Sequence, residues 1–234
     1  SYIHLPESKN LETYDKTVMP RDVLLGACKD FVDMGVRAVN WTGGGEPTIN
    51  KHLKEAITYI GENSDIKMGI FTNGTLLDRW DLFETMVDNM TWVRFSIDAI
   101  RRAKGNQGWD KMVNNLNTLI KVNKDKGKKI GIGVGFVITP DTCHEVVDFA
   151  KFFADIDVDY CQYKPEIVNR EREDGVQRDL EFWNKNVEPQ LEAAKEILGS
   201  KFQINGYKLS DLIEDRSLFG RRYKKCMGSQ IQPC

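Results

Sequence analysis

Several features that define other protein classes are missing from this chain of 234 residues. No apolar run reaches the length of about 18 residues that a membrane-spanning helix needs. Lys and Arg total 33 and Asp and Glu total 35, so no excess of basic charge indicates a nucleic-acid or membrane-surface partner. Three histidines are too few and too scattered for a His-rich metal site. We therefore expect no membrane and no nucleic-acid partner.

Cysteine is scarce as well. The five cysteines are Cys28, Cys143, Cys161, Cys226 and Cys234. An odd number, with the first three far apart, argues against the disulfide framework of a secreted protein and favours a reducing, cytoplasmic location. The first three are expected to be small buried hydrophobic residues. Only the last two lie close together in the chain.

The chain does have an alternation of strand-like and helix-like segments. Five apolar runs predict strands at residues 37–42, 67–72, 92–97, 130–138 and 160–164. Segments with apolar residues at three-to-four spacing separate these runs, which is typical of βαβ units on a parallel sheet.

A helix precedes the first predicted strand. It has Pro20 in its first turn and Gly35 at its end. Because this helix needs a strand before it to complete a βα unit, we expect a first strand to be missing from the front of the chain. Six βα units would form either an incomplete barrel or a doubly wound sheet.

The stretch NWTGGGEPTI, residues 40–49, follows the first predicted strand. Ligands of parallel α/β folds bind at the carboxyl ends of the strands. Glycine backbone there lets a ligand approach closely, and Glu46 adds a carboxylate that suits an ammonium group. A phosphate-binding GxxxxGK[ST] loop would carry a lysine, which is absent here. A tight turn without a ligand is the alternative interpretation.

Polar residues also lie at the ends of three other predicted strands: Asn73 in FTNGT, Ser96 and Asp98 in FSIDA, and Tyr163 and Lys164 in QYKPE. Each alone is typical of a turn or a helix N-cap. Together they would line one mouth of a parallel sheet.

The residue pattern of the third predicted strand predicts which of its side chains face the helices. Alternation places Arg94 and Ser96 on one face and Phe95 and Ile97 on the other. We expect the apolar pair to pack under the helices and the polar pair to face the lumen.

Taken in order, GGGEPT, FTNGT, FSIDA, GVGFVIT and QYKPE resemble the core of a radical S-adenosylmethionine (SAM) enzyme over residues 20–164. The resemblance implies an α/β fold, an incomplete (β/α)6 parallel barrel whose first strand is not in this chain. It also implies that SAM binds at the strand ends. The residues expected there are Gly44, Gly45 and Glu46 at its amino group, Asn73, Ser96 and Asp98 at its ribose or carboxylate, and Val137 and Ile138 near its adenine. Lys164 is expected to neutralise a carboxylate of SAM or of the substrate.

The cysteines depart from the family's pattern. Radical SAM enzymes bind a [4Fe–4S] cluster through a CxxxCxxC motif after the first strand, and no three cysteines here have that spacing. The segment SYIHLP resembles the sequence that follows the last cysteine of the motif. We therefore expect the motif upstream of residue 1. A family member that never bound a cluster is the alternative.

The tail RRYKKCMGSQIQPC resembles the start of a SPASM or twitch extension, in which thiolates bind auxiliary [4Fe–4S] clusters. Cys226 fits the first ligand position and Cys234 fits less well; two free cysteines are the alternative. The sequence therefore divides into a partial barrel, residues 1–200, and an extension, residues 201–234.

The resemblance implies a function for the complete protein. A reduced cluster would cleave SAM to a 5′-deoxyadenosyl radical, which abstracts hydrogen from a peptide, protein or small-molecule substrate. The electron donor would be a flavodoxin or ferredoxin. The alternative is a non-catalytic SAM- or nucleotide-binding barrel that lacks the cluster. A TIM-barrel enzyme for phosphorylated substrates is disfavoured, because Glu46 would repel their anions.

Overall fold

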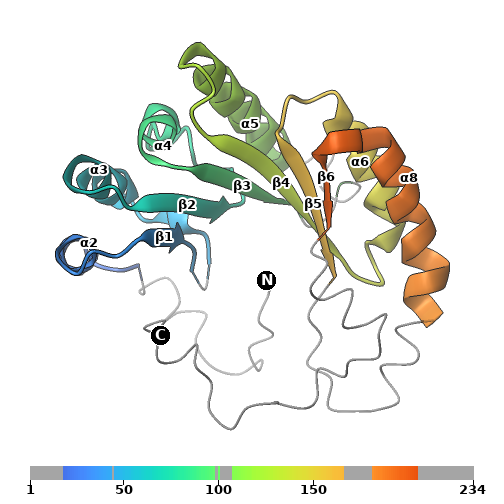
Figure 1. Ribbon diagram of the computed structural model, residues 1–234, viewed down its shortest axis with the longest axis horizontal. Helices are drawn as coiled ribbons and strands as arrows, with labels where there is room; N and C mark the ends of the chain where they lie inside the picture. The colour runs from blue at the N-terminus through green and yellow to red at the C-terminus, as the bar shows by residue number, and fades with distance from the viewer. Residues whose placement is uncertain (1–17, 44, 98–99, 101–106, 166–180, 205–234) are drawn as a thin grey trace, which may run out of the picture. The chain divides into compact units, whose positions relative to one another are not determined.

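The computed structural model describes residues 18–43, 45–97, 100, 107–165 and 181–204. It contains six parallel strands in one sheet, in the order β1-β2-β3-β4-β5-β6 (Figure 1). The strands are β1 (Ala38–Trp41), β2 (Lys67–Thr72), β3 (Trp92–Ile97), β4 (Gly131–Ile138), β5 (Tyr160–Pro165) and β6 (Phe202–Ile204). The predicted α/β fold with a parallel sheet is confirmed.

Helices alternate with these strands. The α-helices are α2 (Arg21–Asp33), α3 (Leu53–Asn63), α4 (Phe83–Asn89), α5 (Gln107–Asp125), α6 (Val146–Ala154) and α8 (Glu188–Leu198). Short helical turns are η1 (Pro47–Ile49), η2 (Cys143–Glu145), η3 (Trp183–Val187) and η4 (Gly199–Lys201). None of the described helices is long and apolar enough to cross a membrane.

All five predicted strands are present, with bounds that differ from the predicted ones by one residue or less. The sixth strand, Phe202–Ile204, was not predicted from the sequence. Apart from residues 201–204, the predicted extension lies outside the described residues, and its separation from the barrel at residue 200 stays a prediction.

The chain forms two compact units, which are described separately. Of the described residues, the first contains 18–97 without 44, 107–134 and 156–159. The second contains Ile100, 135–155, 160–165 and 181–204.

Helix α2 in the first unit begins and ends at the predicted residues. Pro20 is its N-cap residue, where a missing backbone N–H costs no hydrogen bond. Gly35 follows its C-terminus with φ at +67°, a left-handed conformation that glycine adopts without strain. The backbone N–H groups of Gly35 and Val36 donate to the carbonyls of Val32 and Phe31, which closes the last turn.

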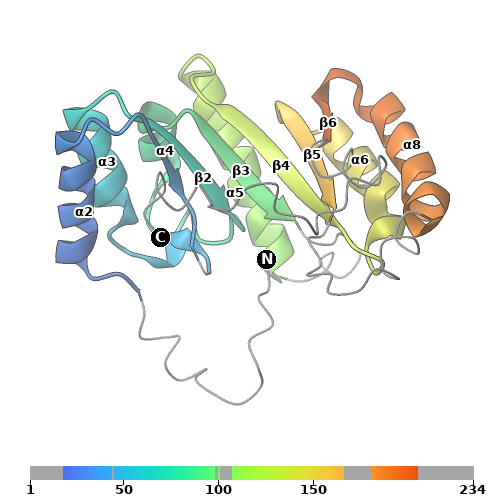
Figure 2. The same ribbon diagram turned by 60° about the horizontal axis from the view of Figure 1, so that its bottom comes forward.

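The helices of the first unit lie along one side of its strands, as Figure 2 shows for α2, α3, α4 and α5. Phe95 lies on this side. An added Cβ at Gly74 would come within 2.3 Å of the Phe95 ring and 3.2 Å of Met112 on α5. Ile97 is buried in the same alternation, at 3 % exposure, whereas Ser96 is exposed. The predicted orientation of β3 is therefore confirmed.

The core of the second unit is largely aromatic. Phe149 of α6 contacts Phe136 of β4 and Tyr163 of β5, with ring centroids 5.0 and 5.3 Å apart. Tyr163 also contacts Phe202 of β6, at 5.5 Å, and is fully buried. Its hydroxyl donates to the carbonyl of Val146, 3.0 Å away. The prediction that Tyr163 lines a mouth is wrong, because its ring belongs to this core.

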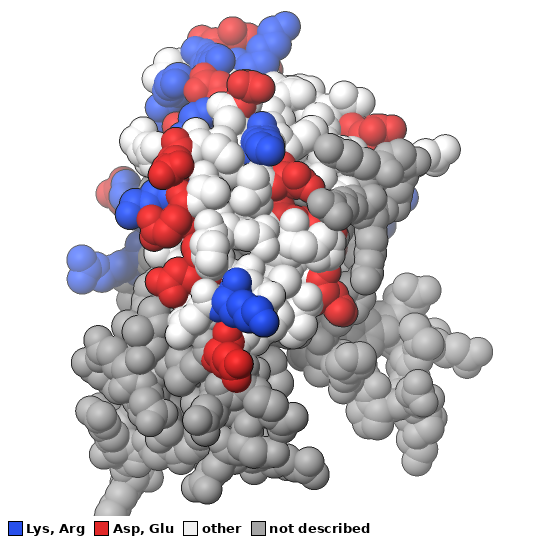
Figure 3. All heavy atoms as spheres, turned by 90° about the vertical axis from the view of Figure 1, so that its right-hand side faces the viewer, with Lys and Arg blue, Asp and Glu red and all other residues white. Residues whose placement is uncertain are grey.

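Charged side chains of both signs lie on the surface turned to the viewer in Figure 3. Lys and Arg are interspersed there with Asp and Glu and with uncharged residues, and they do not gather into one basic patch on that face. The expected absence of a nucleic-acid partner stays a prediction.

Candidate functional site

The carboxylate of Glu46 connects two strand ends in the first unit. Glu46 follows β1 and caps the short helix η1. Its Oε1 atom accepts hydrogen bonds from the backbone N–H of Thr48 at 3.1 Å and from the hydroxyls of Thr48 at 2.5 Å and Thr72 at 2.7 Å. Its Oε2 atom accepts from the backbone N–H of Asn73 at 2.6 Å. The loop after β1 is thereby joined to the end of β2.

Three of these hydrogen bonds are accepted by Oε1 and one by Oε2. Since each carboxylate oxygen has about two lone-pair sites, Oε1 is fully occupied and Oε2 keeps one site. Three of the four donors belong to buried threonines, since Thr48 is 0 % and Thr72 is 2 % exposed. The predicted contact of Glu46 with the amino group of SAM stays a prediction, and the structure adds a role within the chain.

The turn after β2 is held by its own side chains. The hydroxyl of Thr72 accepts from the N–H of Gly74 at 3.0 Å. Asn73 Oδ1 accepts from both the N–H and the hydroxyl of Thr75, at 2.9 and 2.8 Å. Since the oxygen of this side chain is engaged, the amide Nδ2 group of Asn73 is the part that can donate to a ligand oxygen.

Asn115 of α5 also binds the backbone of this turn. It is 4 % exposed, and its Nδ2 donates to the Gly74 carbonyl at 2.8 Å. Sequence reasoning did not find Asn115. The available signal was an asparagine among the apolar positions of an amphipathic helix, close to the buried Met112 and Leu116. A buried amide of this kind indicates a backbone group that needs a partner.

The glycine loop before Glu46 exposes its backbone. A Cβ added at Gly45 would meet nothing within 4 Å, and one at Gly43 would meet only Gly45 at 3.7 Å. Open space of this kind lets a ligand reach the backbone directly. Gly44 and Asp98, both predicted ligands, lie outside the described residues.

The face of β2 and β3 opposite the helices, here called the inner face, carries Phe71, Trp92, Arg94 and Ser96. The Arg94 guanidinium lies 4.1 Å above the Phe71 ring, whose centroid is 4.8 Å from that of Trp92. Ser96 follows toward the carboxyl end of the strand and is exposed. Its hydroxyl is accessible to a ligand on this face.

The remaining predicted SAM ligands belong to the second unit. Val137 is half-buried and Ile138 is 3 % exposed. Because neighbouring strand residues point to opposite faces, Ile138 shares the helix-facing side with Phe136, whereas Val137 lies on the other side. Lys164 likewise lies opposite the buried Tyr163. The position of both residues near adenine stays a prediction.

The described cysteines are core residues. Cys28, Cys143 and Cys161 are free and buried. Burial raises the pKa of Cys28 to about 11 and that of Cys161 to about 12, and it also raises the pKa of Cys143. No group of three His, Cys, Asp or Glu side chains that could hold a metal ion occurs within the described part of the chain. The described residues therefore do not fit an iron–sulfur cluster.

Cys226 and Cys234, the predicted ligands of an auxiliary cluster, lie outside the described residues.

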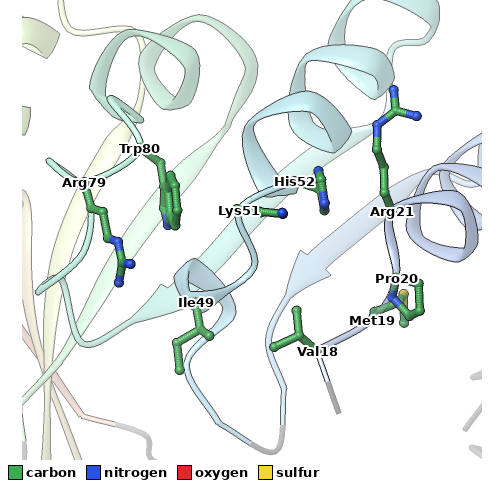
Figure 4. A pocket seen from close by; sticks show the side chains of 9 residues that line it. All are labelled: Val18, Met19, Pro20, Arg21, Ile49, Lys51, His52, Arg79 and Trp80. Carbon is green, nitrogen blue, oxygen red and sulfur yellow. The ribbon is translucent and has the colours of Figure 1, made fainter. Parts of the chain in front are cut away.

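A pocket of about 480 Å³ lies beside η1 (Figure 4). It is lined by Val18, Met19, Pro20, Arg21, Ile49, Lys51, His52, Arg79 and Trp80. The Trp80 indole N–H donates to the Thr48 carbonyl at 2.9 Å, so one wall of the pocket is fixed to the residue that also binds Glu46. None of the predicted SAM ligands lines this pocket.

Comparisons with known proteins agree with this architecture. Two structures of SuiB from Streptococcus suis match with a TM-score of 0.57. The one bound to SAM is 15% identical over 90% of this chain and 47% of its own, and the one bound to the precursor peptide SuiA is 14% identical over 99% and 50%. TYW1 with a lysine-pyruvate adduct bound is 17% identical over 78% of this chain and 65% of its own, with a TM-score of 0.45. At such identities the likeness to SuiB shows the fold alone, and this chain spans about half the length of SuiB.

No curated protein matches the chain significantly. The family model of the radical SAM superfamily matches residues 7–150, which is more than half of the 234 residues. The matched segment includes the glycine loop, Glu46, Asn73 and Ser96, so the ends of β1, β2 and β3 lie within it. The chain belongs to the radical SAM superfamily.

Proposed function

We propose that this chain is the barrel core of a radical SAM enzyme. SAM binds at the carboxyl ends of its strands and is the source of a 5′-deoxyadenosyl radical, which abstracts hydrogen from a substrate. The family match over residues 7–150 carries the proposal.

The chemistry of the described strand ends fits SAM. Asn73 Nδ2 and the Ser96 hydroxyl are donors for the carboxylate or the ribose oxygens. Open backbone at Gly45 allows close approach of the methionine part. In the second unit, Val137 offers an apolar surface for adenine, and Lys164 offers a positive charge for a carboxylate.

The [4Fe–4S] cluster of this family supplies the electron that splits the C–S bond of SAM. Because the described residues do not fit a cluster, the proposed ligands of the cluster are residues other than these, and no described side chain has a proposed role at the cluster. Cys226 and Cys234 remain proposed ligands of an auxiliary cluster.

The proposed substrate is a peptide, a protein or a small molecule, and the proposed electron donor is a flavodoxin or ferredoxin in the cytoplasm. SuiB has been solved with its precursor peptide SuiA. Because the likeness to SuiB shows the fold alone, it does not select among the three substrate classes.

The test uses the whole protein that contains this chain. After anaerobic reconstitution with iron and sulfide, reduction with dithionite in the presence of SAM should release 5′-deoxyadenosine, measured by chromatography. Asn73→Ala should reduce both SAM affinity and product formation. SAM binding without any 5′-deoxyadenosine would favour the non-catalytic SAM-binding barrel, and a protein that binds no SAM would refute the proposed enzyme.

A further inference from the structure

We infer that Glu46 is a positioning residue, whose carboxylate latches the glycine loop after β1 to the end of β2 and does not itself bind the SAM amino group. This inference rests on the proposed function as far as the ligand is SAM. The latch consists of Glu46, Thr48, Thr72 and Asn73.

The first argument is the reach of the carboxylate. Thr72 and Asn73 are separated from Glu46 by 26 and 27 positions in the chain, yet both donate to it, at 2.7 and 2.6 Å. Parallel strands bring their carboxyl ends together, and Glu46 spans the gap between two neighbouring ends. A carboxylate that only bound a ligand would need none of these contacts.

The second argument is the number of donors. Four hydrogen bonds occupy the carboxylate, two of them to the loop itself and two to the end of β2. Three of the donors reach Oε1, so a ligand ammonium group at that oxygen would have to displace a donor of Thr48 or Thr72. Both threonines are buried, and a displaced hydroxyl would lose its partner. Only Oε2, which accepts from the Asn73 N–H alone, keeps a site at which an ammonium group could bind beside the existing donor.

The third argument is the consequence for Asn73. The latch fixes the backbone N–H of Asn73, and the Thr72 hydroxyl that donates to Glu46 also accepts from Gly74 at 3.0 Å. With its oxygen bound to Thr75, Asn73 is left with its amide donors for a ligand. The latched turn thus presents hydrogen-bond donors, which select an oxygen acceptor of SAM.

A direct ligand and a latch predict different results for Glu46→Gln. If Glu46 bound the ammonium group, Gln would keep an oxygen acceptor and lose less affinity than Ala. If Glu46 acts as a latch, the NH2 group of Gln would replace one carboxylate oxygen. It would then face the N–H of Asn73 or of Thr48, and that N–H would lose its acceptor. We therefore expect Gln and Ala to weaken SAM binding to the whole protein alike, by roughly tenfold.

Thr72→Val tests the latch without changing Glu46. It keeps the shape of the buried side chain and removes one donor to the carboxylate together with the acceptor for Gly74. We expect SAM affinity to fall about threefold to tenfold. The matched control is Asp159→Asn, because Asp159 also holds a strand N–H, that of Ile132, at 2.6 Å, but at the amino end of β4. It should lower the unfolding temperature and leave SAM affinity unchanged.

A second measurement does not depend on SAM. Amide hydrogen exchange, followed by NMR, should show faster exchange at Asn73 and Gly74 in Glu46→Ala than in the wild type, with Ile70 unchanged. Equal exchange rates at Asn73 in the wild type and in Glu46→Ala would overturn the latch. Wild-type SAM affinity in Thr72→Val, together with a milder effect of Glu46→Gln than of Glu46→Ala, would also overturn it. A wild-type protein that binds no SAM would refute the proposed function, and the exchange rates would still decide on the latch.

Discussion

Replacing Gly69 with alanine tests the packing of the inner face directly. Gly69 lies on β2 opposite Trp92 of β3 in the parallel register. An added Cβ would lie 2.1–2.5 Å from three atoms of the Trp92 indole, which is closer than real Cβ contacts allow. The indole must therefore move, and its contact with Phe71 at 4.8 Å must loosen.

The size of the effect follows from two opposing terms. Overpacking by one methyl group costs about 1–3 kcal/mol, part of which is the aromatic contact of about 0.5–1.5 kcal/mol that Trp92 loses. Replacing a strand glycine with alanine returns about 0.5–1 kcal/mol of backbone entropy. We expect a net loss of about 0.5–2 kcal/mol in the free energy of unfolding.

Urea denaturation of four variants measures this loss. Gly131→Ala is the matched control on the same face, since its added Cβ would have no neighbour closer than 3.9 Å, and it should be neutral or slightly stabilising. In a Trp92→Ala background, Gly69→Ala should no longer destabilise, so the double-mutant cycle should show a coupling of about 1–3 kcal/mol. If Gly69→Ala behaved like Gly131→Ala in the wild type, the indole would not cover Gly69 and the described inner face would be wrong.

Two further predictions concern a strand and the thiols. Ser96→Ala should raise the Kd for SAM about twofold to tenfold, with little change in stability. Ile97→Ala, at the next position, should destabilise the protein by about 2–5 kcal/mol and leave the Kd of the folded protein nearly unchanged. The reverse pattern would mean that the assigned register of β3 is wrong by one residue. Cys28 and Cys161 should resist iodoacetamide at pH 8.5 in the native protein and react in urea. Folding raises the pKa of these thiols to about 11 and about 12. The thiols therefore stabilise the folded state fully below the pKa of a free thiol, and this stabilisation is lost as the pH rises through the raised values. Alkylation at the rate of a free thiol would contradict their burial.

The positions of the first five strands were predictable because each strand is a separate, predominantly apolar segment of four or more residues, with a helix-like segment before the next. Strand β6 was missed because Phe202–Ile204 is too short to show a period and follows directly on the turn η4. The orientation of β3 was predictable because apolar and polar residues alternate from Val93 to Ile97.

The position of Tyr163 was predicted wrongly. Tyr163 carries a polar group, which suggested a position at the mouth, but it shares a face with Cys161, and both are fully buried. The alternation of the strand should have outweighed the chemical type of this single residue.

The contacts of Glu46 with Thr72 and Asn73 could not be predicted, since they join residues 26 and 27 positions apart whose approach depends on the packed sheet. The sequence nevertheless contained a reason for such contacts. Three successive glycines lose more backbone entropy on folding than any other three residues, so a glycine loop needs an anchor to hold one conformation. Glu46 follows that loop directly and receives four donors, two of which belong to the end of β2. The carboxylate therefore allows the loop to keep the open backbone that close approach of a ligand requires, while the neighbouring strand fixes where that backbone lies.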